Sequence, residues 1–426
     1  MQYKNSRKEE SSSNFLSTIR LFKPGIRIKR WVILWIIGIS LFSTGIGYIT
    51  NKIDISNSFN FLPWHTEGAI LLIVGCAFIA GSFLGLYRTI SQLIVGNPTL
   101  GDIGDTLYSN LSREKGANLV VIGGGTGMSV LLRGLKQYTD NLTAIIGVAD
   151  DGGSSGRLRR ELGVIPPGDF RNCIVAMSDE ESLLPELFQY RFSEGEGLKG
   201  HSFGNLFIVA MSHVADSFEN ALSESSRVLA VRGKITPATT ANLNLSARME
   251  DGELIKGESN ITAEKGTVER LFINPPFAKA YGPSEESILK ADVVIIGPGS
   301  LYTSILPNLM VPGIRDALLN TSALRIYVCN VATEIGETQN FSIEDHVEAL
   351  IKHTDENMLD YVIANNHIMD IGDRFKGNAV PISNQIIRDV QVVYADLLDV
   401  DHPVPVSYTH HRAHETDSYR VWRRLL

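Results

Sequence analysis

Two long apolar runs stand near the start of the chain, Trp31–Ile49 and Ala69–Tyr87, and no charged residue interrupts either of them. Each is close to the ~20 residues that an α-helix needs to cross the hydrocarbon core of a membrane. Residues 1–30 carry eight lysines and arginines against two glutamates, and Lys52 is the one basic residue between the runs. Because basic residues mark the cytoplasmic side, this pattern predicts a transmembrane hairpin over residues 31–87 with a cytoplasmic N-terminus.

A cleaved signal peptide is the alternative for the first run. The basic leader, residues 1–30, is long for a signal peptide, no small-residue cleavage site follows the run, and a second run comes after it. We therefore expect the hairpin to anchor the protein in the plasma (inner) membrane, with the rest of the chain returned to the cytoplasm. Gly81 and Gly85 form a GxxxG motif in the second run, and such a motif lets two helices approach closely.

The pattern changes after a polar linker at residues 88–117. From Asn118, short apolar runs alternate with glycine-rich loops and amphipathic stretches, which is typical of βαβ units in a mainly parallel sheet. The sequence thus predicts an α/β domain, Rossmann-like and doubly wound, over residues 118–426. The expected strands are apolar enough to be covered on both faces, and they are 119–122, 143–148, 291–296, 324–329 and 361–364.

Two segments depart from that alternation. Between residues 166 and 232 the apolar spacing is helical, for example at Leu183, Leu187 and Tyr190, which predicts a helical insertion. Residues 233–275 instead contain runs of threonine, valine and isoleucine broken by Asp251-Gly252, a hairpin signal. We expect a small antiparallel subregion there.

Charge and cysteine usage narrow the function classes. The whole chain has a formal net charge of −8, and since the leader is basic, the body that follows is strongly acidic. An acidic body argues against binding to nucleic acid. The cysteines, Cys76, Cys173 and Cys329, show no paired or CxxC spacing, as is typical of small buried side chains in a reducing compartment.

A glycine-rich loop follows the first expected strand and provides Gly123, Gly124, Gly125, Thr126 and Gly127. Glycines let the backbone approach a diphosphate closely, and the N-terminus of the helix expected from Met128 offers free N–H groups and a positive dipole end. The loop is not a full dinucleotide fingerprint, because Met128 stands where GxGxxG needs its third glycine, and it lacks the lysine of a P-loop. A tight strand-to-helix turn without a ligand is the alternative.

The next expected strand ends in a second polar loop, whose candidate ligand contacts are Asp150, Asp151, Ser154 and Ser155. Asp150 stands about twenty residues further on, where a dinucleotide fold places the acid that binds a ribose. Two adjacent carboxylates can also hold a magnesium ion that bridges phosphates, because hard cations prefer oxygen ligands. An Asp-Gly turn with solvated charges is the alternative. NAD as the ligand rests on Asp150 alone.

Two further motifs offer polar groups near the starts of expected helices. The first supplies Asp169, Arg171 and Asn172 after Pro166-Pro167-Gly168. Arg171 can bind a phosphate bidentately, while Asp169 in this context is also an ordinary helix N-cap. In the second motif His201 and Asn205 lie four residues apart, and so share one face if that segment is helical. Capping or core polar roles remain the alternatives.

A second strand–loop–helix unit follows the strand at 291–296, and its candidate contacts are Gly297, Gly299, Ser300, Tyr302 and Thr303. The hydroxyls and backbone amides can bind a phosphate or sugar, and Tyr302 can stack on a base. Because open parallel sheets bind ligands at the carboxyl ends of their strands, two such loops in one sheet favour a pocket.

Hydrolytic chemistry has little support. No Ser-His-Asp order, GxSxG elbow or HExxH motif occurs, and no cysteine has the basic neighbours of a nucleophile, so we assign no catalytic residue. His410 and His414 have the spacing of helical metal ligands, but such spacings often arise by chance, and a polar C-terminal segment is favoured.

The chain resembles the gluconeogenesis factor (YvcK-like) family over about residues 118–365, through six runs in order: VVIGGGTGMSVLLRGLK, VADDGGSSGRLRRELGVIPPGDFRN, GHSFGNL, VRGKITPAT, MEDGELIKGES and ADVVIIGPGSLYTSILPNLMVPGI. That family is similar in fold to CofD, the 2-phospho-L-lactate transferase of deazaflavin cofactor synthesis. The resemblance implies a binder of UDP-sugars, UDP-N-acetylglucosamine above all, that links carbon metabolism to cell-wall synthesis and cell shape. It also implies that the loop residues named above, with His201 and Asn205, line the nucleotide pocket.

The N-terminal hairpin departs from typical members and suggests tethering near the membrane-bound steps of wall synthesis. Two functions stay open. The first is a non-enzymatic sensor, a monomer or a homo-oligomer, whose UDP-sugar-bound state acts on a regulatory or wall-synthesis protein. The second is a magnesium-dependent phosphotransferase resembling CofD, acting on a deazaflavin acceptor, in which Asp150 or Asp151 holds the metal. An NAD-dependent oxidoreductase is the least supported.

Overall fold

The structure is a computed structural model that describes residues 28–50, 64–91, 113–178, 183–264, 266–366, 377–382 and 386–397. The chain divides into two compact units, Met1–Ser109 and Asn110–Leu426. The leader up to residue 27, most of the expected linker, and His410 and His414 lie outside the described residues.

Two helices form the described part of the first unit, α2 (Ile28–Ile49) and α3 (Trp64–Ser91). Their stretches Arg30–Gly47 and Thr66–Arg88 are long and apolar enough to cross a membrane.

Glycines bring these two helices together. A Cβ on Gly75 would lie 2.7 Å from the backbone nitrogen of Phe42, and one on Gly45 would lie 3.0 Å from that of Leu72. Such short distances show that the two backbones are in close contact, as small residues allow. Of the expected GxxxG motif only Gly85 lies against α2, where a Cβ would meet the ring of Trp31, whereas a Cβ on Gly81 would meet nothing within 4 Å.

An eight-stranded sheet is the centre of the second unit, in the order β10-β11-β9-β8-β7-β1-β2-β3. Neighbouring strands pair in parallel except β10 and β11, which pair antiparallel. This confirms the predicted α/β, mainly parallel architecture. The strands are β1 (Leu119–Gly123), β2 (Leu142–Ile146), β3 (Lys234–Pro237), β7 (Val293–Ile296), β8 (Leu324–Val328), β9 (Tyr361–Asn365), β10 (Ile386–Ile387) and β11 (Val390–Ala395).

The strand order reverses between β1 and β7. From β1 the chain adds β2 and β3 on one side, whereas β7, β8 and β9 are added on the other side. Every residue of β1, β2 and β7 is buried, as expected for strands covered on both faces. Right-handed crossovers in opposite directions place helices on opposite faces of the sheet, and ligands bind at the carboxyl ends of the strands where the order reverses.

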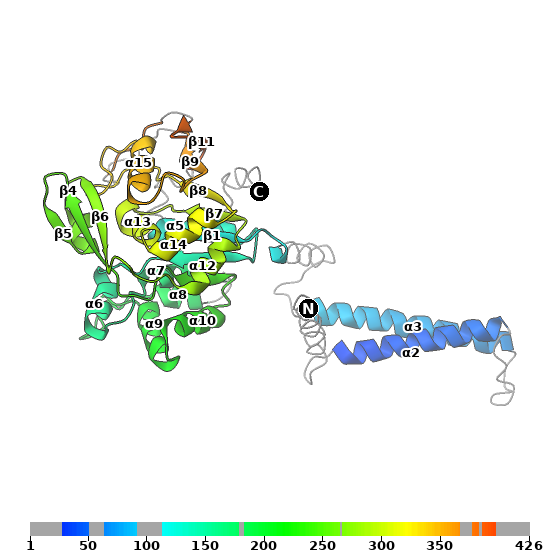
Figure 1. Cartoon of the computed structure of the whole chain (residues 1–426). Coiled ribbons are helices and arrows are strands. Elements are labelled where there is room, and N and C mark those ends of the chain that lie inside the picture. Colours follow the sequence, from blue (N-terminus) through cyan, green and yellow to red (C-terminus); the bar gives the residue numbers. More distant parts are fainter. Residues whose placement is uncertain are drawn as a thin grey trace, which may run out of the picture. The chain divides into compact units, whose positions relative to one another are not determined.

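The segments that depart from βαβ alternation are as predicted except at residues 234–237, which do not belong to the antiparallel subregion but form β3, paired in parallel with β2 in the main sheet. The helical insertion consists of α7 (Gly168–Met177), α8 (Leu184–Gln189), α9 (Phe203–Val214) and α10 (Phe218–Val228). The antiparallel subregion is a three-stranded sheet, seen beside the main sheet in Figure 1, of β4 (Asn244–Met249), β5 (Leu254–Lys256) and β6 (Val268–Asn274). The Asp251-Gly252 turn joins β4 to β5, as expected.

The remaining helices connect these strands. They are α5 (Gly125–Leu135), α6 (Gly153–Leu162), α11 (Glu258–Ala263), α12 (Gly282–Leu289), the π-helix η2 (Leu301–Ile305), α13 (Leu306–Leu309), α14 (Pro312–Asn320) and α15 (Ile343–His353).

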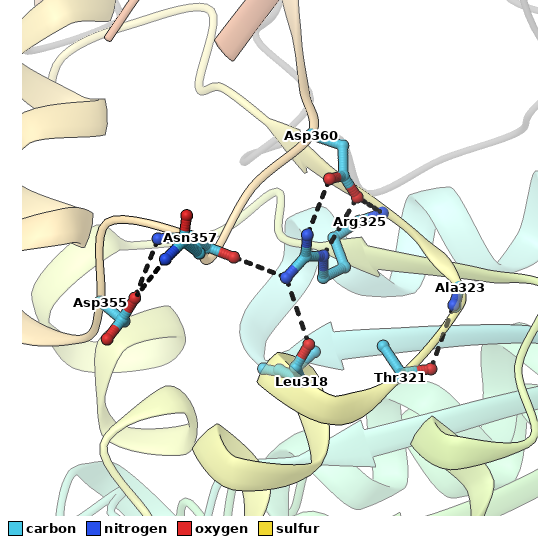
Figure 2. A network of polar contacts seen from close by, with 7 residues as sticks. All are labelled: Leu318, Thr321, Ala323, Arg325, Asp355, Asn357 and Asp360. Atoms are coloured by element: carbon cyan, nitrogen blue, oxygen red, sulfur yellow. Dashed lines mark hydrogen bonds and ion pairs between the residues drawn. The ribbon is translucent and has the colours of Figure 1, made fainter. Parts of the chain in front are cut away.

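An arginine–aspartate pair joins the starts of β8 and β9 (Figure 2). Arg325 donates from Nη2 to Asp360 Oδ1 at 2.7 Å and from Nε to Oδ2 at 3.0 Å. Burial of Asp360 opposes its ionisation, but these hydrogen bonds outweigh burial and lower its pKa. This network stabilises the amino ends of the strands, opposite the edge where a ligand is expected.

Candidate functional site

The first glycine loop is shorter than predicted. β1 ends at Gly123 and α5 begins at Gly125 rather than at Met128. Gly125 has φ +71°, a conformation that glycine adopts without strain, and this lets the chain pass from strand to helix through Gly124 alone. A Cβ on Gly125 would meet only Ser304 Oγ, at 3.8 Å, so this first residue of α5 borders open space.

The loop after β2 is longer, residues 147–152, but its helix also begins at a glycine with positive φ. α6 begins at Gly153, which has φ +48°, and a Cβ there would meet nothing within 4 Å. Ser154 and Ser155 follow in the first turn and are buried. Thus α5 and α6 both present a glycine with open space at their first turns.

The start of α7 meets both of these turns. A Cβ on Gly124 would lie 2.5 Å from Asp169 Oδ2, and one on Gly168 would clash with Ser155 Oγ. Asp169 is not the N-cap that was expected, because α7 already begins at Gly168 and Pro167 is its N-cap. Its carboxylate instead accepts a hydrogen bond from the backbone N–H of Gly125. The first turns of α5, α6 and α7 therefore converge.

These three helices also lack the usual side-chain caps. Ser202, Ser217 and Ser342 cap α9, α10 and α15 by accepting a backbone hydrogen bond. No N-cap side chain does so at α5, α6 or α7. The N–H groups of a helix's first turn have no intrahelical partner, and they carry the positive end of the helix dipole. The convergence therefore concentrates donors at the carboxyl ends of β1 and β2.

Asp150 and Asp151, the expected metal pair, have separate roles. Asp151 accepts backbone hydrogen bonds from Glu258, 3.0 Å from Oδ2, and from Ser259, 2.9 Å from Oδ1. Asp151 therefore caps α11. Asp150 accepts from the backbone N–H of Gly152 at 2.9 Å, and its burial raises its pKa. Within the described residues, no three histidine, cysteine, aspartate or glutamate side chains lie together so as to hold a metal ion by themselves.

Acidic side chains nevertheless gather around Asp150. Burial, followed by the charge of Asp150, raises the pKa of Asp169 to about 6. Burial and the charges of Asp150, Asp151 and then Glu337 raise the pKa of Glu258 to about 8. These shifts show mutual repulsion in a poorly hydrated place, which protons or a cation would relieve.

Five of the residues expected at the site form one hydrogen-bond network beside the first turn of α6. Ser154 Oγ lies 2.9 Å from His201 Nδ1, and Asn205 Nδ2 donates to the same oxygen at 3.0 Å. Arg171 donates to Asn205 Oδ1 at 3.0 Å and to Asn172 Oδ1 at 2.8 Å. Because Ser154 is buried, its contact with His201 fixes the first turn of α6 rather than presenting a nucleophile. His201 precedes α9 rather than lying on it.

The second glycine loop contacts the first one. A Cβ on Gly299 would lie 3.1 Å from the carbonyl oxygen of Gly124, and one on Gly127 would lie 3.1 Å from that of Pro298. The sheet therefore brings the two loops together. Asn330 holds the second loop in place, because its side chain donates to the carbonyl oxygen of Gly299 at 2.9 Å.

The side chains after the second loop do not behave as predicted. Tyr302 is buried in η2, its hydroxyl donates to the Val268 carbonyl at 3.2 Å, and its ring packs against His353. It is therefore not available to stack on a base. Thr303 Oγ1 donates to Glu337 Oε1 at 2.6 Å.

Two buried glutamates explain this difference. Glu337 also accepts the backbone N–H of Tyr302 at 3.0 Å, and Glu334 is hydrogen-bonded to Ser300. Burial, followed by the charge of Glu334, raises the pKa of Glu337 to about 7. Sequence reasoning missed Glu258, Glu334 and Glu337, because each lies far along the chain from the loop that it contacts. Glu258 belongs to the run MEDGELIKGES, but nothing in that run indicates its contact with Asp151.

Comparison with known proteins extends this picture. The family model described as 2-phospho-L-lactate transferase CofD matches residues 119–397, from β1 to just after β11. The chain is 49% identical over 262 residues to a gluconeogenesis factor of Halalkalibacterium halodurans, covering 62% of this chain and 81% of the relative. It is 48% identical over 258 residues to the gluconeogenesis factor of Bacillus subtilis, covering 61% and 81%.

A solved structure shares the fold as well. The crystal structure of a UPF0052 family member from Bacillus halodurans matches with a TM-score of 0.65 and 42% identity, over 67% of this chain and 94% of that one. The match to the family model therefore lies within the second unit.

Proposed function

This chain belongs to the CofD family, with gluconeogenesis factors among its relatives, and on that premise we propose that it is a sensor that binds a nucleotide sugar. UDP-N-acetylglucosamine is the first ligand to test, because the resemblance to gluconeogenesis factors implies it. The bound state would act on a partner protein and so link carbon metabolism to cell-wall synthesis and cell shape.

The observation that carries this proposal is the pair of helix starts at Gly125 and Gly153, which border open space and have no capping side chain at the N-cap position. They lie at the carboxyl ends of β1 and β2, beside the point where the strand order reverses. Helix N-termini favour anions through free N–H groups and the helix dipole, and two adjacent ones suit the two phosphates of a nucleotide sugar.

Isothermal titration calorimetry on the full chain in detergent micelles tests the proposal. UDP-N-acetylglucosamine should bind, and Gly125→Val should weaken binding at least about a hundredfold, because a branched side chain would fill the space where a phosphate is expected. Gly163→Val is the matched control, since Gly163 also has a positive φ and nothing lies within 4 Å of a Cβ there. No binding, or equal binding by Gly125→Val, would sink the proposal.

A magnesium-dependent phosphotransferase resembling CofD is the second candidate, and the acids around Asp150 favour it. Their oxygen donors suit a hard cation, and magnesium is commonly held by one or two carboxylates together with substrate phosphates. Asp150 and Glu258 would hold the ion, which would neutralise charge on a transferring phosphoryl group. The starts of α5 and α6 would bind and orient the phosphates.

Turnover separates the two candidates. Release of a nucleoside monophosphate that needs both magnesium and a deazaflavin acceptor would establish the transferase and contradict a sensor without catalysis. Tight binding of the nucleotide sugar without any release, with or without magnesium, would contradict the transferase.

We propose further that α2 and α3 anchor the protein in the plasma membrane, with the second unit in the cytoplasm. The two apolar helices and the excess of basic residues before Trp31 support this arrangement. Washing membranes with alkaline carbonate provides the test. An anchored protein stays with the lipid, whereas release of the full chain into the wash would show that the hairpin does not span the membrane.

A further inference from the structure

Cations gather at one end of the site although the chain as a whole is acidic. Arg157 donates to the carbonyl oxygen of Lys199 at 2.9 Å, and Arg191 donates to that of Gly200 at 2.6 Å. Arg171 bonds only to the neutral side chains of Ser202, Asn205 and Asn172. Within the described part of the chain, none of the three arginines forms an ion pair with a carboxylate.

The pair in Figure 2 shows the usual arrangement for a partly buried arginine. Arg325 meets both carboxylate oxygens of Asp360, so each charge is neutralised by the other. Arg171 is more deeply buried, with 7% of its surface exposed, yet it has no such partner. Its Nε is buried without any acceptor.

The arginines influence one another and His201. Burial, followed by the charge of Arg191, lowers the pKa of Arg171 to about 10. Burial and then the charge of Arg157 lower the pKa of His201. The charges of Asp169 and Asp150 act on the pKa of Arg171 in the opposite direction but form no ion pair with it, so a bound anion would provide this buried cation with a direct partner.

The first turn of α6 adds donors to the same place. Ser154 bonds to His201 and Asn205, which connects this turn to Arg171. Gly156 is the first residue of α6 whose N–H bonds back along the chain, to Gly152 at 2.7 Å. The N–H groups of residues 153–155 therefore have no helical partner, and Gly153 is exposed.

We propose that Arg157, Arg171, Arg191 and the first turn of α6 form a subsite for a compact anionic group, a carboxylate or a phosphate, beside the expected position of the diphosphate. The inference rests on the proposed function, because it adds a second anion to the same site. The anionic group has two sources: an acid on the sugar of the nucleotide sugar, or a separate phosphate ion.

Two matched ligands distinguish the sources by calorimetry on the full chain in detergent. UDP-glucuronate and UDP-glucose differ only at C6 of the sugar, which is a carboxylate in the first and a hydroxymethyl group in the second. If the group belongs to the sugar, UDP-glucuronate should bind about tenfold or more tightly, since hydrogen bonds to charged groups are among the strong ones. If it is separate, inorganic phosphate should bind by itself and should tighten the binding of UDP-glucose.

Two variants test whether the arginines cause the preference for the carboxylate or the binding of phosphate. The double variant Arg157→Gln/Arg191→Gln should lose the preference for the carboxylate, or the binding of phosphate. Arg227→Gln should keep it, because Arg227 lies on α10 and pairs with Glu224. Arg171 is left unchanged because its burial makes a folding defect the simpler result.

These measurements distinguish a failure of the proposed function from a failure of the anion subsite. If no uridine nucleotide binds but phosphate binds to the wild type and not to the double variant, the proposed nucleotide-sugar function fails and the anion subsite stands. If neither the carboxylate nor phosphate distinguishes the wild type from the double variant, the subsite is wrong.

Discussion

The two glycine loops of the main sheet share a sequence pattern but present different surfaces. After β1, Gly125 begins α5 beside open space. After β7, the side chains that follow the loop turn inward, where Tyr302 and Thr303 are buried and bonded. The residues that pack against a loop, and not its glycines, therefore decide whether its backbone is available to a ligand.

The difference has a physical origin in what lies beneath each loop. No N-cap side chain caps α5, and although the buried Asp169 carboxylate accepts the N–H of Gly125, Gly125 still borders open space. In the second loop a buried carboxylate, Glu337, takes the hydrogen bonds of both Tyr302 and Thr303, whose side chains are buried. A buried carboxylate needs such donors, so it holds these residues in position. We therefore assign ligand contacts to the first loop and a supporting role to the second.

The largest expected effect is on ligand affinity at the start of α6, which borders open space. Gly153 and Gly163 stand at opposite ends of α6, both with positive φ and open space around a Cβ. Valine at either position should cost similar stability, because the backbone strain is similar. Only Gly153→Val should weaken nucleotide-sugar binding, by about a hundredfold, as measured by calorimetry. Equal affinities in the two variants would remove the start of α6 from the site.

A smaller effect, on the stability of the fold, is expected at Thr303, which follows the second glycine loop. Thr303→Val keeps the shape of the side chain but removes the donor that bonds Glu337. We expect the free energy of unfolding to fall by about 1–3 kcal/mol, because a buried acceptor loses a partner. Calorimetric unfolding measures this. An unchanged stability together with lost nucleotide-sugar binding would reverse the roles that we give to the two loops.

The third expected effect is a dependence of stability on pH. The pKa of Glu258 is raised from 4.5 to about 8 in the folded chain. The folded state therefore holds a proton that the unfolded chain releases, so this group favours folding below about pH 5 and loses that effect as pH rises towards 8. The melting temperature of the wild type should fall across this window relative to that of Glu258→Gln. A difference that does not change with pH, or changes in the opposite direction, would contradict the acidic environment of Glu258.

Most of the fold followed from the sequence. The buried strands show as short apolar runs, and the Asp251-Gly252 turn shows where β4 and β5 pair. These signals are local in the sequence, and the packing of the folded chain agrees with them. The GxxxG motif was right at Gly85, which lies against Trp31 of α2, and wrong at Gly81, where a Cβ would meet nothing within 4 Å, because helix contact depends on which face each glycine occupies.

The site was less predictable because its geometry depends on distant residues. The sequence pointed to Ser154, His201 and Asn205, and the structure brings them together. It could not show that Asp151 caps α11, since Glu258 and Ser259 lie more than a hundred residues away. Nor could the pattern around Tyr302 reveal that Glu337 would hold that segment inward.

A crystal structure of the protein with UDP-N-acetylglucosamine is the most direct test of the central claim. We expect the diphosphate to lie over Gly125 and Gly153, within hydrogen-bond distance of backbone N–H groups in the first turns of α5 and α6. A nucleotide sugar bound elsewhere, with these two turns unoccupied, would contradict the account.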